Sequence, residues 1–380
     1  MKQFLALFIS LISMAYSSAS VAEMKVIVNV PYSTPDSNLY ITGNFDHCNW
    51  DPQCKKLEPS PAKGQILSYF YVIKSAGPVE FKITRGDWNK QAANYKGEAL
   101  ENQFLNIPVN DANKGVPFIF NIVNWTDHLL WESGEVIEWD HFYSANLDNS
   151  RKIWIWIPPN YSADSKPYPT VYMHDGENIF NNIKRMGYKT SRFDHNWAID
   201  STMAKLTTLT LVKPAIVVGV SSISWKGRFE EYDPFIKTGQ RYMKLIVEEL
   251  IPAIEANFNA SKDRNDRFAM GSSMGALISL GLLNQYSEKF SKAACLSFFN
   301  RGYDPKAISK YFKTFKNKYP VKLYLDHGQE ETGYQNWNAP LSEYLSTDTP
   351  VLYRTFPHSL HSEEHWARRA ELPIQFLLQK

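Results

Sequence analysis

Short stretches of alternating apolar and polar residues dominate the first third of the chain. They cover, with turn residues between them, residues 24–30, 38–43, 66–73, 78–84 and 116–123. Alternation with a period of two is typical of strands that bury one face, and several short strands at close spacing favour a β-sandwich. The pattern therefore predicts a small all-β, immunoglobulin-like sandwich over residues 23–124.

From about residue 134 the pattern changes to apolar strand segments that alternate with helices. Strands are predicted at residues 215–220, 267–270, 293–299, 321–325 and 350–356, and helices at residues 274–283 and 363–378. Such alternation is typical of an α/β fold with a parallel sheet. We therefore predict an α/β domain over residues 135–380, with the boundary between the two domains within residues 125–133.

The first 22 residues have the three parts of a secretory signal peptide. Residues 1–3 are a short basic start, residues 4–14 are apolar but too short to span a bilayer, and residues 20–22 form a small-x-small cleavage site. No later stretch is long and apolar enough for a transmembrane helix. We therefore expect a periplasmic or secreted protein whose mature chain starts near Glu23.

The composition is that of an ordinary globular protein, with 44% hydrophobic and 21% charged residues. A net charge of +2 gives no case for binding nucleic acid or an anionic membrane surface. Cys48 and Cys54 are close enough in sequence for a local disulfide in an oxidising compartment, whereas Cys295 lies in a predicted buried strand. Because no cysteine or histidine pair has zinc spacing, we predict neither a metal site nor a cofactor.

Residues 271–275 have the pattern G-x-S-x-G, between the predicted strand 267–270 and the predicted helix 274–283. This pattern holds a serine at the tip of a strand–turn–helix corner, where flanking glycines avoid a clash between the crossing strand and helix. A glycine–serine loop with no function is the alternative, and the flanking strand and helix argue against it. Ser273 is therefore our candidate nucleophile.

A serine hydroxyl needs a base, which an acid orients, and in this type of fold the chain order is serine, acid, histidine. The loop between the last predicted strand and the last predicted helix holds His358 and His361. The loop after the predicted strand 321–325 holds Asp326 and Glu331. The residues themselves leave both choices open.

The N-terminal domain resembles the starch-binding and glycogen-binding family of early-set β-sandwiches. The matching segments are residues 30–31, 34–35, 40–44, 50–52, 81–88 and 101–102. The resemblance makes Trp50 and Trp88 candidates for stacking on sugar rings, because an aromatic face suits the apolar face of a sugar. The alternative, which we favour for Trp88, is that these side chains plug the sandwich core or its interface with the second domain.

The C-terminal domain resembles the putative esterase family of α/β-hydrolases, which includes enterochelin, feruloyl and acetylxylan esterases, esterase D and mycolyltransferases. Four segments in family order carry the resemblance: residues 151–161 with an ending like LPPxY, residues 168–180, the elbow at 271–275, and H-x-E-x-x-W at 361–366. Ala276 departs from the family, whose members usually carry a second glycine there. The resemblance implies an α/β-hydrolase domain preceded by the small all-β sandwich.

The resemblance also implies roles for individual residues. It favours His361 as the base, with His358 in reserve, and Glu331 as the acid, three residues after a glycine, with Asp326 as a supporting residue. The oxyanion of the tetrahedral intermediate needs two preorganised amides. These are expected at Met274 and at Gly176 or Glu177, and His174 is expected to shape that loop.

An R-x-x-E-Y segment of the family matches Arg228, Glu231 and Tyr232, which either line the substrate cleft or brace a loop through salt bridges. Four aromatic residues are candidates for an apolar cleft: Trp225, Phe299, Trp337 and Trp366.

The sequence thus predicts a secreted or periplasmic serine carboxylic ester hydrolase that works through an acyl-enzyme. Its partner would be a small-molecule or carbohydrate ester, with a carbohydrate-linked or aryl ester preferred. Three alternatives stay open: a siderophore trilactone esterase, an acyltransferase to a sugar, and a non-catalytic glycan-binding protein.

Overall fold

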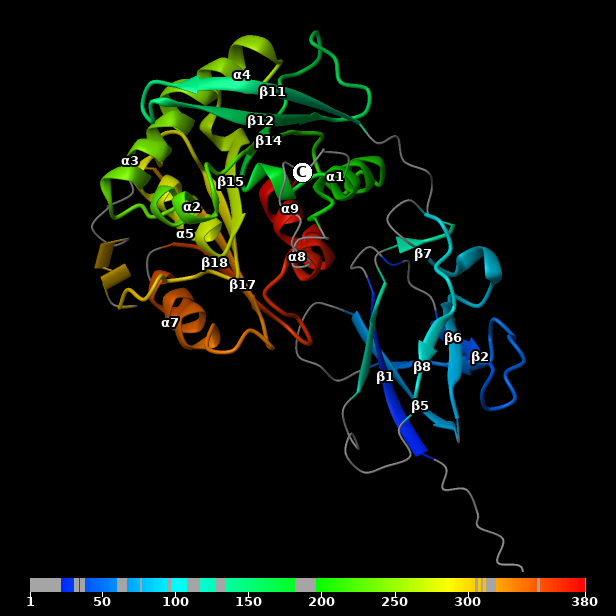
Figure 1. Ribbon diagram of the computed structural model, residues 1–380. Coiled ribbons are helices and arrows are strands. Elements are labelled where there is room, and N and C mark those ends of the chain that lie inside the picture. The colour runs from blue at the N-terminus through cyan, green and yellow to red at the C-terminus, as the bar shows by residue number, and fades with distance from the viewer. Residues whose placement is uncertain are drawn as a thin grey trace, which may run out of the picture.

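The computed structural model shows a β-rich N-terminal region followed by a larger α/β region (Figure 1). The residues that it describes are 22–30, 34, 38–59, 67–75, 77–93, 97–107, 117–122, 124–127, 134–181, 196–304, 307–308, 310–311, 319–346 and 349–379. Nearly all of the predicted signal peptide and most of the predicted domain boundary lie outside these residues, as do residues 31, 35, 66, 116 and 123 of the sandwich segments.

Two four-stranded sheets form most of the N-terminal region. One has the order β4-β5-β1-β9, with β4 Glu58–Pro59, β5 Leu67–Ser75, β1 Ala22–Val30 and β9 Phe118–Asn121. The other has the order β3-β2-β6-β8, with β3 Lys55–Lys56, β2 Tyr40–Gly43, β6 Val79–Thr84 and β8 Gln103–Leu105. Alternate residues of both sheets, such as Val26 and Val28 of β1 and Phe81 and Ile83 of β6, are buried in one shared core. Short strands β7 Ala92–Ala93 and β10 Asn124–Trp125 pair beside the two sheets.

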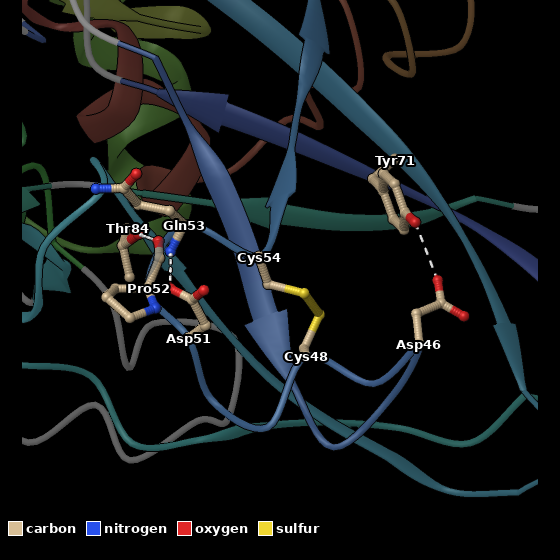
Figure 2. The surroundings of a disulfide bond; sticks show 8 residues. All are labelled: Asp46, Cys48, Asp51, Pro52, Gln53, Cys54, Tyr71 and Thr84. Atoms are coloured by element: carbon tan, nitrogen blue, oxygen red, sulfur yellow. Dashed lines mark hydrogen bonds between the residues drawn. A yellow bond between two sulfur atoms is a disulfide. The ribbon is translucent and has the colours of Figure 1, made fainter.

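A disulfide between Cys48 and Cys54 closes the loop that follows β2 (Figure 2). The Tyr71 hydroxyl donates a hydrogen bond to Asp46 at 2.9 Å, which ties one arm of this loop to β5. The other arm is tied to the loop after β6, because the side-chain Nε2 of Gln53 donates to the Gly86 carbonyl at 3.0 Å. The disulfide that the sequence left open is therefore present, and its loop lies against the loop that carries Trp88.

Trp50 and Trp88 both lie outside the core of the N-terminal region. Trp50 is half-buried within the disulfide loop, and Trp88 begins a 3₁₀ turn, η1 Trp88–Lys90, none of whose residues is buried. The Trp88 side chain is 37% exposed. The interpretation of Trp88 as a plug of the sandwich core is therefore wrong.

The α/β region is built on an eight-stranded sheet with the order β11-β12-β14-β13-β15-β16-β17-β18. Strands β11 and β12 are antiparallel to their neighbours, and the strands from β14 onward run parallel. The strands are β11 Glu135–Ser144, β12 Asn149–Ile157, β13 Thr170–His174, β14 Ile216–Val220, β15 Arg267–Ser272, β16 Lys292–Leu296, β17 Lys322–Gly328 and β18 Val351–Phe356.

Helices cover both faces of this sheet, as expected for parallel strands that are apolar on both sides. On one face lie α3 Lys237–Lys244, the π-helical turn η4 Leu245–Leu250, α4 Ile251–Asn257 and α5 Met274–Gln285. On the other face lie α1 Ile199–Thr208, α8 Glu363–Arg369 and α9 Glu371–Leu378. Helices α2 Trp225–Glu231 and α7 Gln335–Leu345 lie after the carboxyl ends of β14 and β17. No helix of the described part of the chain is long and apolar enough to cross a membrane.

The carboxyl ends of the parallel strands meet at one edge of the sheet, which is where open α/β sheets place their ligands. Segments that start at the ends of β13, β15, β17 and β18 carry His174, Ser273, Glu331 and His361. The parallel topology therefore gathers residues from four distant parts of the sequence at this edge.

Candidate active site

Ser273 lies at the sharp turn between β15 and α5. Its backbone has φ of +55° and ψ of −122°, a conformation that non-glycine residues rarely adopt. Its amide donates to the Leu296 carbonyl of β16 at 3.0 Å, which fixes the turn against the sheet. A Cβ on Gly271 would come within 2.6 Å of the Gly275 carbonyl oxygen, so the close crossing of strand and helix requires glycine there. The motif thus forms a strained corner of the kind that clusters at functional sites.

Glu331 and His361 form a hydrogen-bonded pair at the same edge of the sheet. His361 Nδ1 lies 3.3 Å from Glu331 Oε2. The other carboxylate oxygen, Oε1, accepts hydrogen bonds from the Ser297 hydroxyl at 2.6 Å and the Gly328 amide at 3.0 Å. The Glu331 side chain is fully buried, whereas that of His361 is 30% exposed. The buried carboxylate therefore holds the Nδ1 edge of a partly exposed imidazole.

Behind this pair, the fully buried Arg369 of α8 contacts two carboxylates. Its Nη2 lies 3.2 Å from Glu331 Oε1 and 3.1 Å from Asp326 Oδ1. Burial by itself would raise the pKa of Glu331, but the hydrogen bond with His361 and the charge of Arg369 lower that pKa to about 2. Asp326 behaves oppositely: burial, assisted by the negative charge of Glu331, raises its pKa to about 6 in spite of Arg369.

The structure thus separates the two candidate acids. Asp326 accepts hydrogen bonds from the Tyr324 hydroxyl at 2.9 Å and the Ser297 amide at 3.3 Å, in the network around Arg369. Glu331 is the carboxylate that contacts His361. The reserve base His358 has its Nδ1 3.8 Å from Glu330 instead.

Tyr334 is a residue of this site that the sequence analysis missed. Its hydroxyl lies 3.3 Å from His361 Nε2, and its ring packs 4.6 Å from that of His361. Burial raises the pKa of the Tyr334 phenol above its ordinary value. No sequence motif identifies Tyr334 as a residue of the site, because its position depends on how the loop after β17 folds. The described contacts run from Tyr334 through His361 to Glu331.

The loop after β13 lies beside the elbow. Asp175 has a left-handed backbone with φ of +57°, and the 3₁₀ turn η3 Gly176–Asn178 follows it. A Cβ on Gly176 would come within 2.7 Å of the Gly219 carbonyl carbon, so glycine allows this loop to pack against β14. Met274 is the first residue of α5, and the amides of a first helical turn lack intrahelical acceptors. The backbone segments predicted to bind the oxyanion are thus brought to one edge of the sheet.

Arg228 and Tyr232 hold this loop in place. The Arg228 guanidinium donates to both carboxylate oxygens of Asp175, from Nε at 2.5 Å and from Nη2 at 2.7 Å. The Tyr232 hydroxyl accepts a hydrogen bond from the Asp175 amide at 2.9 Å. Glu231 pairs with the buried Arg151 of β12. Tyr232 is fully buried and Arg228 is 7% exposed, and both brace the loop through these hydrogen bonds. Their role in binding substrate stays a prediction.

Glu177, on the loop after β13, and His174, the last residue of β13, have hydrogen-bond partners of their own. The Glu177 carboxylate accepts hydrogen bonds from the hydroxyl of Ser222 at 2.5 Å and from its amide at 3.2 Å. Burial and the nearby Asp175 raise the pKa of Glu177 to about 7. The His174 ring contacts the Tyr242 hydroxyl at 2.9 Å, and burial lowers its pKa to about 3, so this histidine is neutral.

Aromatic and apolar side chains lie around the site. Trp337 is half-buried, with its ring 5.1 Å from that of Tyr334 and 6.3 Å from that of Phe299. Trp225 is 55% exposed. Trp366 donates to the Ser297 hydroxyl at 2.8 Å and is 5% exposed, with its ring 4.9 Å from that of His361. Among the described residues, no three His, Cys, Asp or Glu side chains are grouped so that they could hold a metal ion.

Comparison with known protein families shows where this chain belongs. The family described as putative esterase matches residues 144–369, more than half of the chain. The chain belongs to the putative esterase family. The matched segment includes the elbow, both members of the Glu331–His361 pair, and Arg369.

Two proteins are similar in sequence to parts of this chain. The uncharacterized protein YbbA of Bacillus subtilis (strain 168) is 28% identical over 166 residues, which are 40% of this chain and 59% of YbbA. This chain therefore spans about three-fifths of the length of that relative. An endo-1,4-beta-xylanase/feruloyl esterase of Xylanibacter ruminicola is 26% identical over 210 residues, which are 50% of this chain and 28% of that protein.

Solved structures show the same fold. The enterobactin esterase of Shigella flexneri covers 92% of this chain with 90% of its own length, at a TM-score of 0.53 and 14% sequence identity. The predicted fold class, an α/β-hydrolase domain after a β-rich N-terminal region, is therefore confirmed.

Proposed function

We propose that this protein is a serine carboxylic ester hydrolase. The observation that supports this most is the joint placement of Ser273 on a strained elbow and the Glu331–His361 pair at neighbouring strand ends. In the proposed reaction, Ser273 Oγ attacks the ester carbonyl and His361 accepts the proton. Glu331 stabilises the imidazolium, and the amides of Met274 and of the 176–177 turn stabilise the oxyanion. Water then hydrolyses the acyl-enzyme.

For the substrate we prefer a carbohydrate-linked or aryl ester. Exposed apolar side chains near the site support this choice: Ile223 is 47% exposed, Trp225 55% and Leu360, next to His361, 52%. Clustered exposed apolar side chains are typical of binding surfaces. The relative from Xylanibacter ruminicola, which is named a feruloyl esterase, supports the same choice.

A siderophore trilactone is the second candidate substrate, supported by the likeness to the enterobactin esterase over 92% of the chain. A ferric catecholate siderophore is strongly anionic, so a site for it needs cationic side chains with charge to spare. Arg228, the guanidinium beside the oxyanion loop, is already paired with the Asp175 carboxylate. This neutralised pair favours an uncharged ester.

The experiment that tests the proposed function is fluorophosphonate labelling of the folded protein, with Ser273→Ala as the matched control. Wild-type protein should be labelled and the variant should not. Unlabelled wild-type protein would exclude the serine mechanism and favour a non-catalytic protein. Turnover of p-nitrophenyl acetate, feruloyl-sugar and ferric-siderophore esters then separates the substrates, and activity that needs an added sugar acceptor would indicate an acyltransferase.

We also propose that the N-terminal region binds glycan through Trp50 and Trp88. The half-buried Trp50 and the exposed Trp88 lie on loops that the Gln53–Gly86 hydrogen bond ties together. Two accessible indole rings on adjoining loops could stack on neighbouring sugars. Retention of the full chain on insoluble α-glucan should fall in Trp50→Ala and Trp88→Ala variants, and equal retention of all three proteins would reject this role.

The predicted signal peptide leads us to propose a periplasmic or secreted location. Cell fractionation with N-terminal sequencing tests this proposal. A mature chain that starts near Glu23 outside the cytoplasm supports it, and an intact N-terminus in the cytoplasmic fraction contradicts it.

A further inference from the structure

Ser297 directly follows β16 and is fully buried, yet its backbone is in the left-handed region. Its φ is +46°, a conformation that non-glycine residues rarely adopt. Its amide donates to the backbone carbonyl of Asp326 at 2.8 Å, so the neighbouring strand β17 holds this conformation. Strained residues persist only where the surrounding structure imposes them, and they cluster at functional sites. The strained backbone therefore indicates a specific task for the Ser297 side chain.

The Ser297 hydroxyl has its full set of hydrogen-bond partners. It accepts from Trp366 Nε1 at 2.8 Å and from Arg369 Nη2 at 2.6 Å. A serine hydroxyl has two lone pairs and one proton, so both of its acceptor positions are occupied. Its proton is therefore directed to Glu331 Oε1, which lies 2.6 Å away. The two donors thus fix the direction in which Ser297 donates.

The partners of Glu331 are divided between its two oxygens. Besides the Ser297 hydroxyl, Oε1 accepts from the Gly328 amide at 3.0 Å and from Arg369 Nη2 at 3.2 Å. Oε2 lies 3.3 Å from His361 Nδ1. Three donors on one oxygen favour the ionised carboxylate and fix its rotation. Nδ1 must then carry the imidazole proton, which leaves the lone pair of Nε2 to act as the base.

Trp366 connects the Ser297 hydroxyl to the base. Its ring lies 4.9 Å from that of His361 at an interplanar angle of 83°, and its Nε1 donates to Ser297. His361 and Trp366 are the first and last residues of the H-x-E-x-x-W segment. The segment that supplies the base therefore also orients the hydroxyl that holds the acid.

We propose that Ser297 is a positioning residue for the acid, an inference that rests on the proposed esterase function. Its hydroxyl holds the Glu331 carboxylate so that Oε2 stays on His361 Nδ1. Without that hydroxyl, one of the three donors to Oε1 is lost and the carboxylate is freer to rotate. The imidazolium that forms when His361 accepts the serine proton is then less well oriented and less well stabilised. Support of this kind determines how precisely the reacting residues are held.

The test compares Ser297→Ala with Ser279→Ala. Ser279 is a matched control, because it is equally buried and its hydroxyl donates to the Gly275 carbonyl at 2.8 Å within α5, the helix that follows the elbow. In Ser297→Ala, kcat on p-nitrophenyl acetate should fall about 30-fold, which is part of the roughly 10²- to 10⁴-fold that a positioned base contributes. Its KM should stay within about twofold of wild type, and so should both constants of Ser279→Ala.

A double variant shows whether Ser297 acts through Glu331. If it does, Ser297→Ala/Glu331→Gln should turn over within about threefold of Glu331→Gln alone, because the hydroxyl no longer has a carboxylate to hold. A general loss of packing would instead multiply the two effects and make the double variant about 30-fold slower than Glu331→Gln. That result would overturn the proposal. A Ser297→Ala variant with wild-type kcat, or an equal fall in Ser279→Ala, would overturn it too.

Thermal unfolding first establishes that each variant is folded. If Ser297→Ala is not, Ser297→Gly takes its place, because it removes the same hydroxyl and glycine adopts a φ of +46° without strain. Wild-type protein that fluorophosphonate does not label at Ser273 would refute the proposed esterase function. Labelled wild-type protein with an unaffected Ser297 variant would refute only the positioning role, so the two failures are distinguishable.

Discussion

Replacing Arg369 with methionine should destabilise the α/β domain severely. The guanidinium is fully buried and contacts the carboxylates of Asp326 at 3.1 Å and Glu331 at 3.2 Å, as well as the Ser297 hydroxyl at 2.6 Å. Methionine keeps much of the volume but leaves two buried carboxylates with no cation. Removal of one partner of a buried ion pair costs about 3–5 kcal/mol. For a domain of this size, that loss lowers the melting temperature by about 6 to 20 °C.

The pH dependence of this loss has a definite sign. Burial already raises the pKa of Asp326 to about 6 from an ordinary value of 3.8, and loss of the arginine charge raises it further. A carboxyl group with a raised pKa in the folded state destabilises the fold at high pH and stops doing so once it is protonated. The loss of unfolding free energy in Arg369→Met relative to wild type should therefore be larger at pH 8 than at pH 5.

The assay is thermal unfolding of wild type, Arg369→Met and Arg369→Met/Asp326→Asn at both pH values, followed by tryptophan fluorescence. The double variant should regain part of the loss at pH 8, because the asparagine carries no charge that needs a partner. An Arg369→Met variant within about 1 kcal/mol of wild type at pH 8 would refute the reasoning. A deficit that grows on acidification would refute it equally.

Three further predictions follow from the same geometry. Ser273→Ala should abolish fluorophosphonate labelling while stability stays near that of wild type. Ser273→Gly should raise the melting temperature, because it relieves about 1 kcal/mol of backbone strain, and an unchanged melting temperature would contradict this. Glu331→Gln should lower kcat on the order of 10⁴-fold. In the folded protein the pKa of Glu331 is lowered from 4.5 to about 2, so its ionised carboxylate stabilises the fold fully above pH 4.5 and ceases to do so toward pH 2. In urea titrations, the difference in unfolding free energy between wild type and Glu331→Gln should therefore shrink from pH 4.5 to pH 2. Replacing Cys48 and Cys54 with serine should cost the N-terminal region about 2 kcal/mol with labelling of Ser273 unchanged, and slower labelling would contradict this independence of the two regions.

Much of the architecture could be predicted from the sequence because it depends on local patterns. Alternating residues in the first third of the chain become strands such as β1 and β6, since period-two burial needs only a sheet face to pack on. The elbow is equally local: Gly271 and Gly275 approach so closely that no Cβ fits on the first. The sequence left the surroundings of Trp88 open between the solvent, the core and the domain interface, because an indole on a turn has the same local pattern in each case.

The sequence by itself determined the candidate nucleophile, the order of the strands and helices, and the loops that hold the candidate acid and base. Only the tertiary structure showed how the contacts of two carboxylates five residues apart differ: Arg369 contacts both, and Glu331 also contacts His361. It also turned Arg228 toward Asp175, 53 residues away, and brought Tyr334 next to His361. The physical reason is the same in each case: a side chain's partner is set by which strand ends adjoin in the sheet, and no local pattern encodes that neighbourhood.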